Sequence, residues 1–374
     1  MYSSVNFPKT HDLMSGLRSI HSSSSQGTQT PSNQQRSEST LADSDADRDL
    51  LNVDGLTLDY ATIDGRVRVL EKVSLQMRKG EILGVVGESG SGKTTLGLAI
   101  IGLLDSPPAE IMNGSITFEG KNLLKLSPAE LSQFRGPGIG MVFQEALAAL
   151  NPVYRTDVQL RESIKVLERA NGMNLSAEGE DKLMIDTLND LRLDKPEWVV
   201  KKYPHELSGG MRQRVSIAMA IVEKPKLLIL DEVTTGLDVY VQNRILNILK
   251  DLNRRTGTAM MFITHDLMVA SQICDRLYVM YAGRVMEEGG TERILNAPAH
   301  PYTQKLFAAI PHGFVDSPPL PAPVGEAPDL RNLPTGCKFH PRCPFVMEKC
   351  KEKEPAFFET DDDRSVLCWL LEKK

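Results

Sequence analysis

A glycine-rich segment lies between an apolar run and a predicted helix, and its residue types are those that bind phosphate. Residues 87–94 read GESGSGKT, which matches the pattern of Gly, four residues, Gly, Lys, and Ser or Thr. Glycines let the backbone curl so that its N–H groups point at phosphate oxygens, and the start of the following helix adds partial positive charge. Lys93 is expected to bridge the terminal phosphates of ATP, and the Thr94 hydroxyl is expected to ligate Mg²⁺. The predicted nucleotide-binding residues of this segment are Gly87, Glu88, Ser89, Gly90, Ser91, Gly92, Lys93, Thr94 and Thr95.

Two adjacent acidic residues follow a second apolar run. Residues 227–232 read LLILDE, so Asp231 and Glu232 stand at the end of a predicted buried strand. A magnesium nucleotide site needs a carboxylate at such a strand end, and Asp231 is expected to hold the metal. Glu232 is expected to orient or deprotonate the attacking water, which contributes roughly 10²- to 10⁴-fold to a rate. An isolated pair would indicate a solvated strand end, but the phosphate loop upstream favours the catalytic interpretation.

The segments around these residues predict the elements that position them. Apolar runs at 81–87, 224–232 and 258–266 alternate with helical patterns such as 239–257, which is typical of a parallel sheet covered by helices. From Leu51 onward, apolar and polar residues alternate, which predicts an antiparallel sheet with one exposed face. The fold class is therefore α/β.

Composition divides the chain further. Residues 1–49 are rich in Ser, Gln, Thr and Asn and are interpreted as a disordered tail, with a transit peptide as the weaker alternative. Residues 50–290 are predicted to form the ATP-binding domain, with a helical insertion at about 150–212. Residues 291–374 form a predicted C-terminal domain, and within it a proline-rich linker at 311–334 leads to a group of cysteines.

Charge and hydropathy exclude some classes of function. The 374 residues carry a formal net charge of −6, which gives no broad cationic surface, and nucleic acid is not an expected partner. No apolar run approaches the roughly 20 residues that a membrane-spanning helix needs. Any membrane role is therefore expected to be exercised through a partner. Because no secretory signal pattern opens the chain, reduced thiols are expected.

Further segments occur in a fixed order between and after these motifs. Gln144 ends MVFQ, residues 207–214 read LSGGMRQR, Asp238 ends TTGLD, and His265 lies in FITHD. With the phosphate loop and the acidic pair, this set resembles the ATP-binding subunit of ABC transporters. The resemblance implies a P-loop NTPase fold of ABC type with an antiparallel β subdomain, a RecA-like parallel-sheet core, a helical subdomain and a small C-terminal metal-binding extension.

The resemblance also implies a role for each matching residue. Gln144, Glu232 and His265 are the implied catalytic residues: Gln144 would contact magnesium and water, and His265 would contact the γ-phosphate. Tyr60 is similar to the aromatic residue that stacks on adenine, with a sheet-surface aromatic as the alternative. The remaining implied nucleotide-binding residues are Ser208, Gly209, Gly210, Gln213 and Asp238.

The signature LSGGMRQR occurs once and lies far along the chain from the phosphate loop. In this family Ser208, Gly209 and Gly210 would bind the γ-phosphate of ATP held by the opposite subunit, since small residues that open a helix expose N–H donors to an anion. A working site is therefore expected to need two subunits arranged head to tail.

Three positions depart from the family pattern. Val233 replaces the usual Pro, Gly236 replaces Ala or Ser, and Glu145 replaces Asp. None of them removes a ligand, but the first two change the turn that places Glu232 and Asp238. A reduced hydrolysis rate is one expectation from these changes.

Four of the five cysteines gather near the C-terminus. Cys337, Cys343, Cys350 and Cys368 have five, six and seventeen residues between successive members, which favours a metal centre over disulfides in a reducing setting. The wide spacing and a Cys-Pro step favour a [4Fe-4S] cluster, with zinc and metal-free thiols as alternatives. His340 is a possible alternate ligand, and Cys274 is interpreted as a small buried side chain.

The segments 299–311 and 336–350 resemble the C-terminal extension of oligopeptide and dipeptide ABC importers. This resemblance implies a peripheral ATPase at the cytoplasmic face of the cell membrane. Its implied partners are a second ABC ATPase subunit, two transmembrane permeases and an extracytoplasmic solute-binding protein. Nickel, glutathione or oligosaccharide are alternative cargoes. A soluble ABC ATPase is the alternative class, and the predicted absence of a second ATP-binding domain and of a long coiled coil disfavours it.

Overall fold

The computed structural model describes residues 49–144, 149–308, 328–360 and 364–372. The predicted tail except its last residue, Asp49, lies outside these ranges, as do Glu145 and most of the proline-rich linker. Among the residues that the structure describes, no helix is both long and apolar enough to cross a bilayer.

The alternating segment after Leu51 forms an antiparallel sheet, as its period of two predicts. Its four strands have the order β2-β1-β4-β5. On β1, side chains such as Leu51, Val53 and Leu58 are buried, and they pack in one hydrophobic cluster with the first helix of the nucleotide-binding core. The strands are β1 (Asp49–Thr62), β2 (Gly65–Arg78), β4 (Ala109–Phe118) and β5 (Lys121–Asn122).

The apolar runs form a second, eight-stranded sheet with the order β11-β12-β10-β9-β3-β8-β7-β6. Its centre is parallel, because β3 pairs with β8 and β9, and β7 pairs with β6 and β8. Every residue of β3, β7 and β8 is buried, which explains their continuous apolar sequences. The strands are β3 (Ile82–Val86), β6 (Ile139–Val142), β7 (Leu227–Asp231), β8 (Ala259–Thr264), β9 (Arg276–Tyr281), β10 (Arg284–Gly290), β11 (Phe358–Glu359) and β12 (Ser365–Val366).

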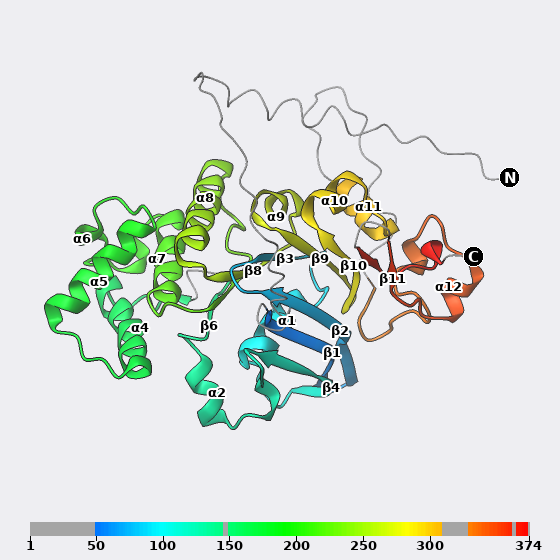
Figure 1. Cartoon of the computed structure of the whole chain (residues 1–374), viewed down its shortest axis with the longest axis horizontal. Helices are drawn as coiled ribbons and strands as arrows, with labels where there is room; N and C mark the ends of the chain where they lie inside the picture. The colour runs from blue at the N-terminus through cyan, green and yellow to red at the C-terminus, as the bar shows by residue number, and fades with distance from the viewer. Residues whose placement is uncertain (1–48, 145–148, 309–327, 361–363, 373–374) are drawn as a thin grey trace, which may run out of the picture. The chain divides into compact units, whose positions relative to one another are not determined.

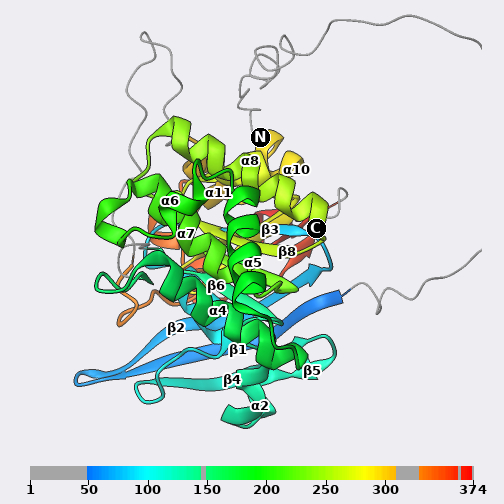
Figure 2. The ribbon, with the colours of Figure 1, turned by 90° about the vertical axis from the view of Figure 1, so that its left-hand side faces the viewer.

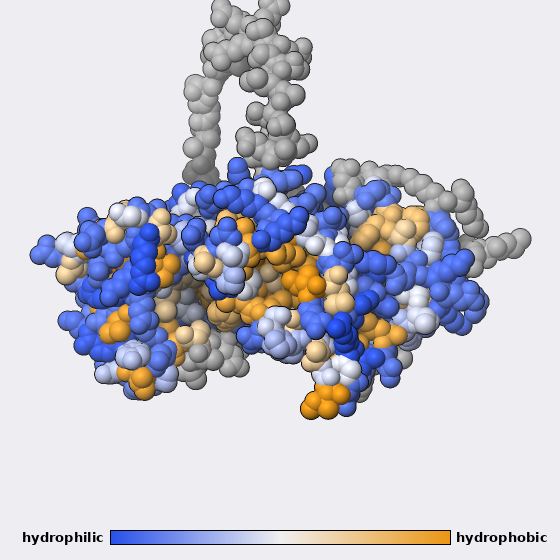
Figure 3. All heavy atoms as spheres, turned by 90° about the horizontal axis from the view of Figure 1, so that it is seen from below, coloured by the Kyte–Doolittle hydropathy of each residue, from blue (hydrophilic) through white to orange (hydrophobic). Residues whose placement is uncertain are grey.

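Helices connect most of the successive strands of this sheet (Figures 1 and 2). A helical subdomain lies between β6 and β7 in the sequence and comprises α4 (Thr156–Asn171), α5 (Ala177–Asp190), α6 (Pro196–Val199) and α7 (Gly209–Ile221). Its helices α4, α5 and α6 are largely hydrophilic on the face shown in Figure 3, whereas hydrophobic residues gather in the middle of that face. The other α-helices of the described residues are α1 (Lys93–Ile101), α2 (Pro128–Phe134), α8 (Val239–Thr256), α9 (Leu267–Ile273), α10 (Thr291–Asn296), α11 (Pro301–Ala308) and α12 (Glu348–Glu352).

The residues after α10 extend the sheet instead of forming a separate layer. Strand β12 pairs antiparallel with β10, and β11 pairs with β12. We call the described residues from Pro301 onward the C-terminal extension. Cys337 and Cys350 of this extension belong to the main hydrophobic core, and Cys343 packs against it.

Candidate functional site

The phosphate loop connects β3 to α1, and its glycines are required by close backbone contacts. A Cβ on Gly87 would lie 2.1 Å from the carbonyl oxygen of Met280, and one on Gly92 would lie 2.9 Å from that of Val69. Gly92 also has a φ of +97°, a conformation that favours glycine. The loop is therefore closely packed against β9 and β2.

Lys93 is folded back over this loop. Its ammonium donates hydrogen bonds to the carbonyl oxygens of Gly87 and Glu88 at 2.8 and 2.9 Å. Burial lowers the pKa of Lys93, and the carboxylates of Glu232, Asp231 and Glu88 oppose this shift. The lysine side chain is thus held by the loop carbonyls where the terminal phosphates of a nucleotide would arrive.

The predicted magnesium ligands are brought together. The Thr94 hydroxyl donates a hydrogen bond to Oδ1 of Asp231 at 3.1 Å, although 137 positions separate the two residues. Burial raises the pKa of Asp231, and this hydrogen bond partly offsets the shift. A hydroxyl beside a carboxylate is a donor set that fits Mg²⁺, because this ion prefers oxygen ligands.

The three predicted catalytic side chains also converge. Gln144 Nε2 donates to Oε2 of Glu232 at 3.0 Å, and His265 Nδ1 lies 3.2 Å from Oε1 of the same carboxylate. Thr235 Oγ1 donates a further hydrogen bond at 3.2 Å. Glu232 has a φ of +47°, so its backbone adopts a left-handed conformation directly after β7. The carboxylate is thereby held by three neighbours at the mouth of the phosphate loop.

Most of these groups line one cavity of about 620 Å³, whereas the predicted residues Gly87, Ser91 and Asp231 do not line it. The sequence analysis gave no role to its lining residues Val69, Leu306 and Leu330, nor to Thr235, although Thr235 lies in the motif TTGLD. Leu306 and Leu330 belong to the C-terminal extension, and no local pattern marks them as nucleotide contacts. The predicted residues that line this cavity are Glu88, Ser89, Gly90, Gly92, Lys93, Thr94, Thr95, Gln144, Glu232 and His265.

Tyr60 does not line this cavity. It lies on β1 opposite Val67 and Ala109, and its partly buried ring packs against the hydrophobic cluster of the β subdomain. Its assignment as the adenine contact stays a prediction.

The signature residues do not line the cavity either. Ser208 caps the start of α7 by accepting a hydrogen bond from the Met211 N–H at 3.3 Å, and Gly209 and Gly210 form the first turn of that helix. Gln213 is buried, and its Nε2 has no hydrogen-bond partner among the described residues. One chain therefore presents the signature at the start of a helix, away from its own phosphate loop.

The turn after Glu232 contains two of the departures from the family pattern. Val233 is buried at 1% exposure and packs in the main hydrophobic core. Gly236 has a φ of +74° with open space around its Cα, so glycine relieves the backbone strain that a larger residue would have there. Asp238 then caps α8 by accepting a hydrogen bond from the Val241 N–H at 3.0 Å. The expected effect on the hydrolysis rate stays a prediction.

The four C-terminal cysteines, together with His340, line one small cavity. Burial raises the pKa of the Cys337 thiol to about 11 and that of Cys368 to about 12. Within the described ranges, however, no group of three or more His, Cys, Asp or Glu side chains is arranged to hold a metal ion. Cys274 lies apart from this cavity and is buried behind β3, as its interpretation as a small core side chain predicts.

Comparison with known proteins agrees with this geometry. Residues 70–235 match the ABC transporter family, and residues 286–350 match the C-terminal region of oligopeptide and dipeptide transporters. The dipeptide transport ATP-binding protein DppD of Escherichia coli (strain K12) is 40% identical over 319 residues, which cover 85% of this chain and 96% of that protein. The oligopeptide transport ATP-binding protein OppD of Bacillus subtilis (strain 168) is 42% identical over 323 residues, covering 86% and 89%.

A solved structure shows the same fold. The dimeric ATP-binding cassette MJ0796, bound to ADP and Pi, superimposes with a TM-score of 0.57 and 29% identity, covering 65% of this chain and 99% of the other. The fold and the site define an ABC-type ATPase. The chain belongs to the ABC transporter family, within the ATP-binding proteins of its oligopeptide and dipeptide branch. As a member it binds and hydrolyses ATP.

Proposed function

We propose that this chain powers the uptake of peptides across the cell membrane from its cytoplasmic face. The observation that carries the proposal is the likeness to DppD and OppD over about 85% of the chain, which includes the C-terminal region. Membership in the family implies permease partners and dimerisation. The full assembly that we propose contains a second ATPase subunit, two permeases and an extracytoplasmic solute-binding protein.

The residues of the cavity define the steps of hydrolysis. Lys93 and the loop amides bind the phosphates, while Thr94 and Asp231 would hold Mg²⁺, which neutralises charge on the phosphates when bound. Glu232 accepts a proton from water as the water oxygen bonds to the γ-phosphorus and the bond to the bridging oxygen breaks. Gln144 and His265 orient the Glu232 carboxylate.

Binding of the signature residues to ATP on the partner subunit is the step that couples two subunits. Ser208, Gly209 and Gly210 would face the γ-phosphate of ATP on the partner, because the N–H groups at the start of α7 attract an anion. Support for this arrangement comes from the separation of signature and phosphate loop within one chain. ATP then closes the pair, and hydrolysis reopens it.

Cargo is tested with the complete transporter in sealed vesicles. We expect short peptides, presented with the solute-binding protein, to stimulate ATP hydrolysis several-fold over the rate without cargo. Nickel, glutathione and oligosaccharide serve as competing cargoes in parallel assays. Stimulation by one of these and not by peptides would refute peptide uptake while leaving the ATPase assignment intact.

A [4Fe-4S] cluster at the C-terminal cysteines is part of the proposal. Four thiols that line one cavity are a donor set that fits iron, although they are not arranged around a metal in this structure. Cys337, Cys343, Cys350 and Cys368 would hold the cluster, with His340 as an alternate ligand. When bound, the cluster would cross-link the extension.

Protein purified without oxygen is expected to be brown, to absorb broadly near about 400 nm, and to contain iron and sulfide in equal amounts. Cys350→Ser is expected to lose the colour, because Cys350 lines the shared cavity. Cys274→Ser is the matched control and keeps it, since Cys274 lies behind β3. A colourless protein that contains one zinc ion per chain would refute the cluster and would favour a zinc site.

A further inference from the structure

The phosphate-loop residue Glu88 is held by two residues of the C-terminal extension. Arg342 donates two hydrogen bonds to the Glu88 carboxylate, from Nη1 at 2.8 Å and from Nη2 at 3.0 Å. The main-chain N–H of Glu88 donates to the hydroxyl of Tyr302 at 2.9 Å. Both the side chain and the backbone of one phosphate-loop residue are therefore bound to a segment more than 200 positions away.

Both residues that hold Glu88 are themselves fixed in place. Tyr302 is 1% exposed and Arg342 is 8% exposed. The Tyr302 ring packs against Tyr281 and Phe339, with centroids 4.6 and 5.4 Å apart, and the Arg342 guanidinium lies over the same two rings. A bidentate, largely buried pair of this kind defines a single geometry for the carboxylate.

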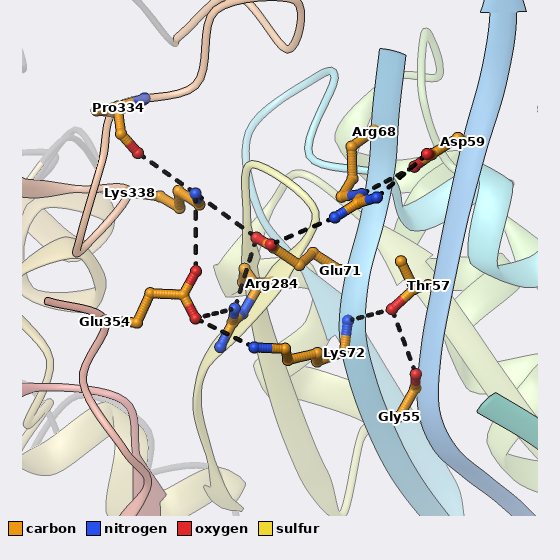
Figure 4. A network of polar contacts seen from close by, with 10 residues as sticks. All are labelled: Gly55, Thr57, Asp59, Arg68, Glu71, Lys72, Arg284, Pro334, Lys338 and Glu354. Carbon is orange, nitrogen blue, oxygen red and sulfur yellow. Dashed lines mark hydrogen bonds and ion pairs between the residues drawn. The ribbon is translucent and has the colours of Figure 1, made fainter. Parts of the chain in front are cut away.

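A charge network holds the extension on its other side (Figure 4). Lys338 lies 3.6 Å from the Glu71 carboxylate on β2. Glu354 lies 3.4 Å from Lys72 on β2 and 3.3 Å from Arg284 on β10. These ion pairs anchor the extension to both sheets. They therefore help to fix the position of Arg342 relative to the phosphate loop.

The backbone around Arg342 belongs to the cysteine cluster. Arg342 ends the short 3₁₀ turn His340–Arg342, and Cys343 follows it directly. The N–H of His340 donates to the carbonyl of Cys337 at 3.0 Å, and the N–H of Cys343 donates to that of His340 at 3.3 Å. The backbone of the turn that carries Cys337 and Cys343 therefore sets where the Arg342 side chain begins.

We propose that Arg342 and Tyr302 are positioning residues that hold the phosphate loop in its nucleotide-binding shape, so that the thiol-bearing turn controls the affinity for ATP. A loop without this support occupies other shapes for part of the time. Apparent affinity falls in proportion to the fraction of molecules with a competent loop. If that fraction is about one tenth, the Kd for ATP rises about 10-fold, which corresponds to about 1.4 kcal/mol.

Neutral variants of Glu88 and Arg342 test the proposal, because the direction in which each variant changes the affinity for ATP distinguishes two explanations. Simple electrostatics predicts that Glu88→Gln tightens ATP binding, because it removes a negative charge beside the phosphates, and that Arg342→Gln weakens it. Support of the loop predicts that both changes weaken binding, by about 10-fold each, and that the double variant is no weaker than either single one. The measurement is equilibrium titration with a fluorescent ATP analogue on the full chain.

The same titration includes matched controls. Arg331→Gln removes an arginine of the extension that pairs only with exposed Asp329 in the described contacts, and it is expected to leave the Kd within twofold. Tyr302→Phe removes one hydroxyl and is expected to raise the Kd by a smaller factor of about threefold. Tighter binding by Glu88→Gln, or independent effects that multiply in the double variant, would overturn the proposal.

Hydrogen exchange supplies a second readout that a purely structural role would not change. By reciprocity, ATP binding at the loop stabilises the turn that supports it. ATP is expected to slow amide exchange over residues 337–343 in the wild type, and to have no such effect in Glu88→Gln. Glu88 lies outside the extension, so the sequence of the extension is unchanged in this variant, and its amide exchange without ATP checks that the extension stays folded. Equal protection of the turn in both proteins would contradict the coupling.

Discussion

Glu232→Gln is expected to lower the rate of ATP hydrolysis by at least about 100-fold, while ATP binding persists. The amide has nearly the shape of the carboxylate but cannot accept a proton from the attacking water. Its neighbours Gln144, Thr235 and His265 would still surround it, so the architecture of the cavity is retained. The checks are phosphate release at saturating ATP and the Kd of a fluorescent ATP analogue.

The same variant is expected to accumulate as an ATP-bound pair, because the step that reopens it is lost. Size-exclusion chromatography with and without ATP measures this change, using the chain together with its partner ATPase where one is required. Glu119→Gln is the matched control: Glu119 pairs with Lys226 away from the cavity, and its loss is expected to leave turnover unchanged. Near-normal hydrolysis by Glu232→Gln would show that another group activates the water.

Ser208→Arg is expected to abolish ATP-driven pairing and to lower hydrolysis by at least about 100-fold, with ATP binding to the single chain within twofold of normal. The long side chain would fill the space at the start of α7 where the partner's γ-phosphate is expected. Because Ser208 does not line the chain's own cavity, its replacement leaves the phosphate loop intact. Pairing, turnover and nucleotide affinity are measured on the same preparation.

A mixing experiment separates loss of the shared site from damage to the fold. Neither Lys93→Ala nor Ser208→Arg alone forms a complete site. In a mixed pair, the intact phosphate loop of the Ser208→Arg chain meets the intact signature of the Lys93→Ala chain. One complete site forms, and part of the activity is expected to return. Ser132→Arg, at an exposed serine of α2, controls for the added charge and bulk. Full activity of Ser208→Arg by itself would remove the basis for a head-to-tail pair.

The C-terminal extension contributes residues to the nucleotide cavity and contacts the phosphate loop. Leu306 and Leu330 contribute to the nucleotide cavity, and Arg342 reaches the phosphate loop. Lys305 donates a hydrogen bond to the carbonyl of Arg342, so α11 supports the same turn. A change in the backbone of the turn His340–Arg342 can therefore reach the phosphate loop through the largely buried Arg342.

The chemistry of the site follows from the sequence itself, because it depends on short local patterns. A glycine-rich loop followed by Lys93 has few conformations other than a phosphate-binding turn at the start of a helix. A strand that ends in Asp231 and Glu232 presents both acids at the edge of a parallel sheet. The Thr94–Asp231 and Gln144–Glu232 contacts confirm that these segments meet.

Contacts between distant segments were decided only by the tertiary structure. The pair Glu88–Arg342 joins residues 254 positions apart, and Tyr302 reaches the same residue across 214 positions. No periodicity or spacing encodes such contacts, since they depend on how β10 and the extension pack against β3. For the same reason the packing of the partly buried Tyr60 ring against the hydrophobic cluster of the β subdomain was not visible in the sequence. Local patterns determine which groups can do chemistry, whereas packing over long separations determines which groups hold them in position.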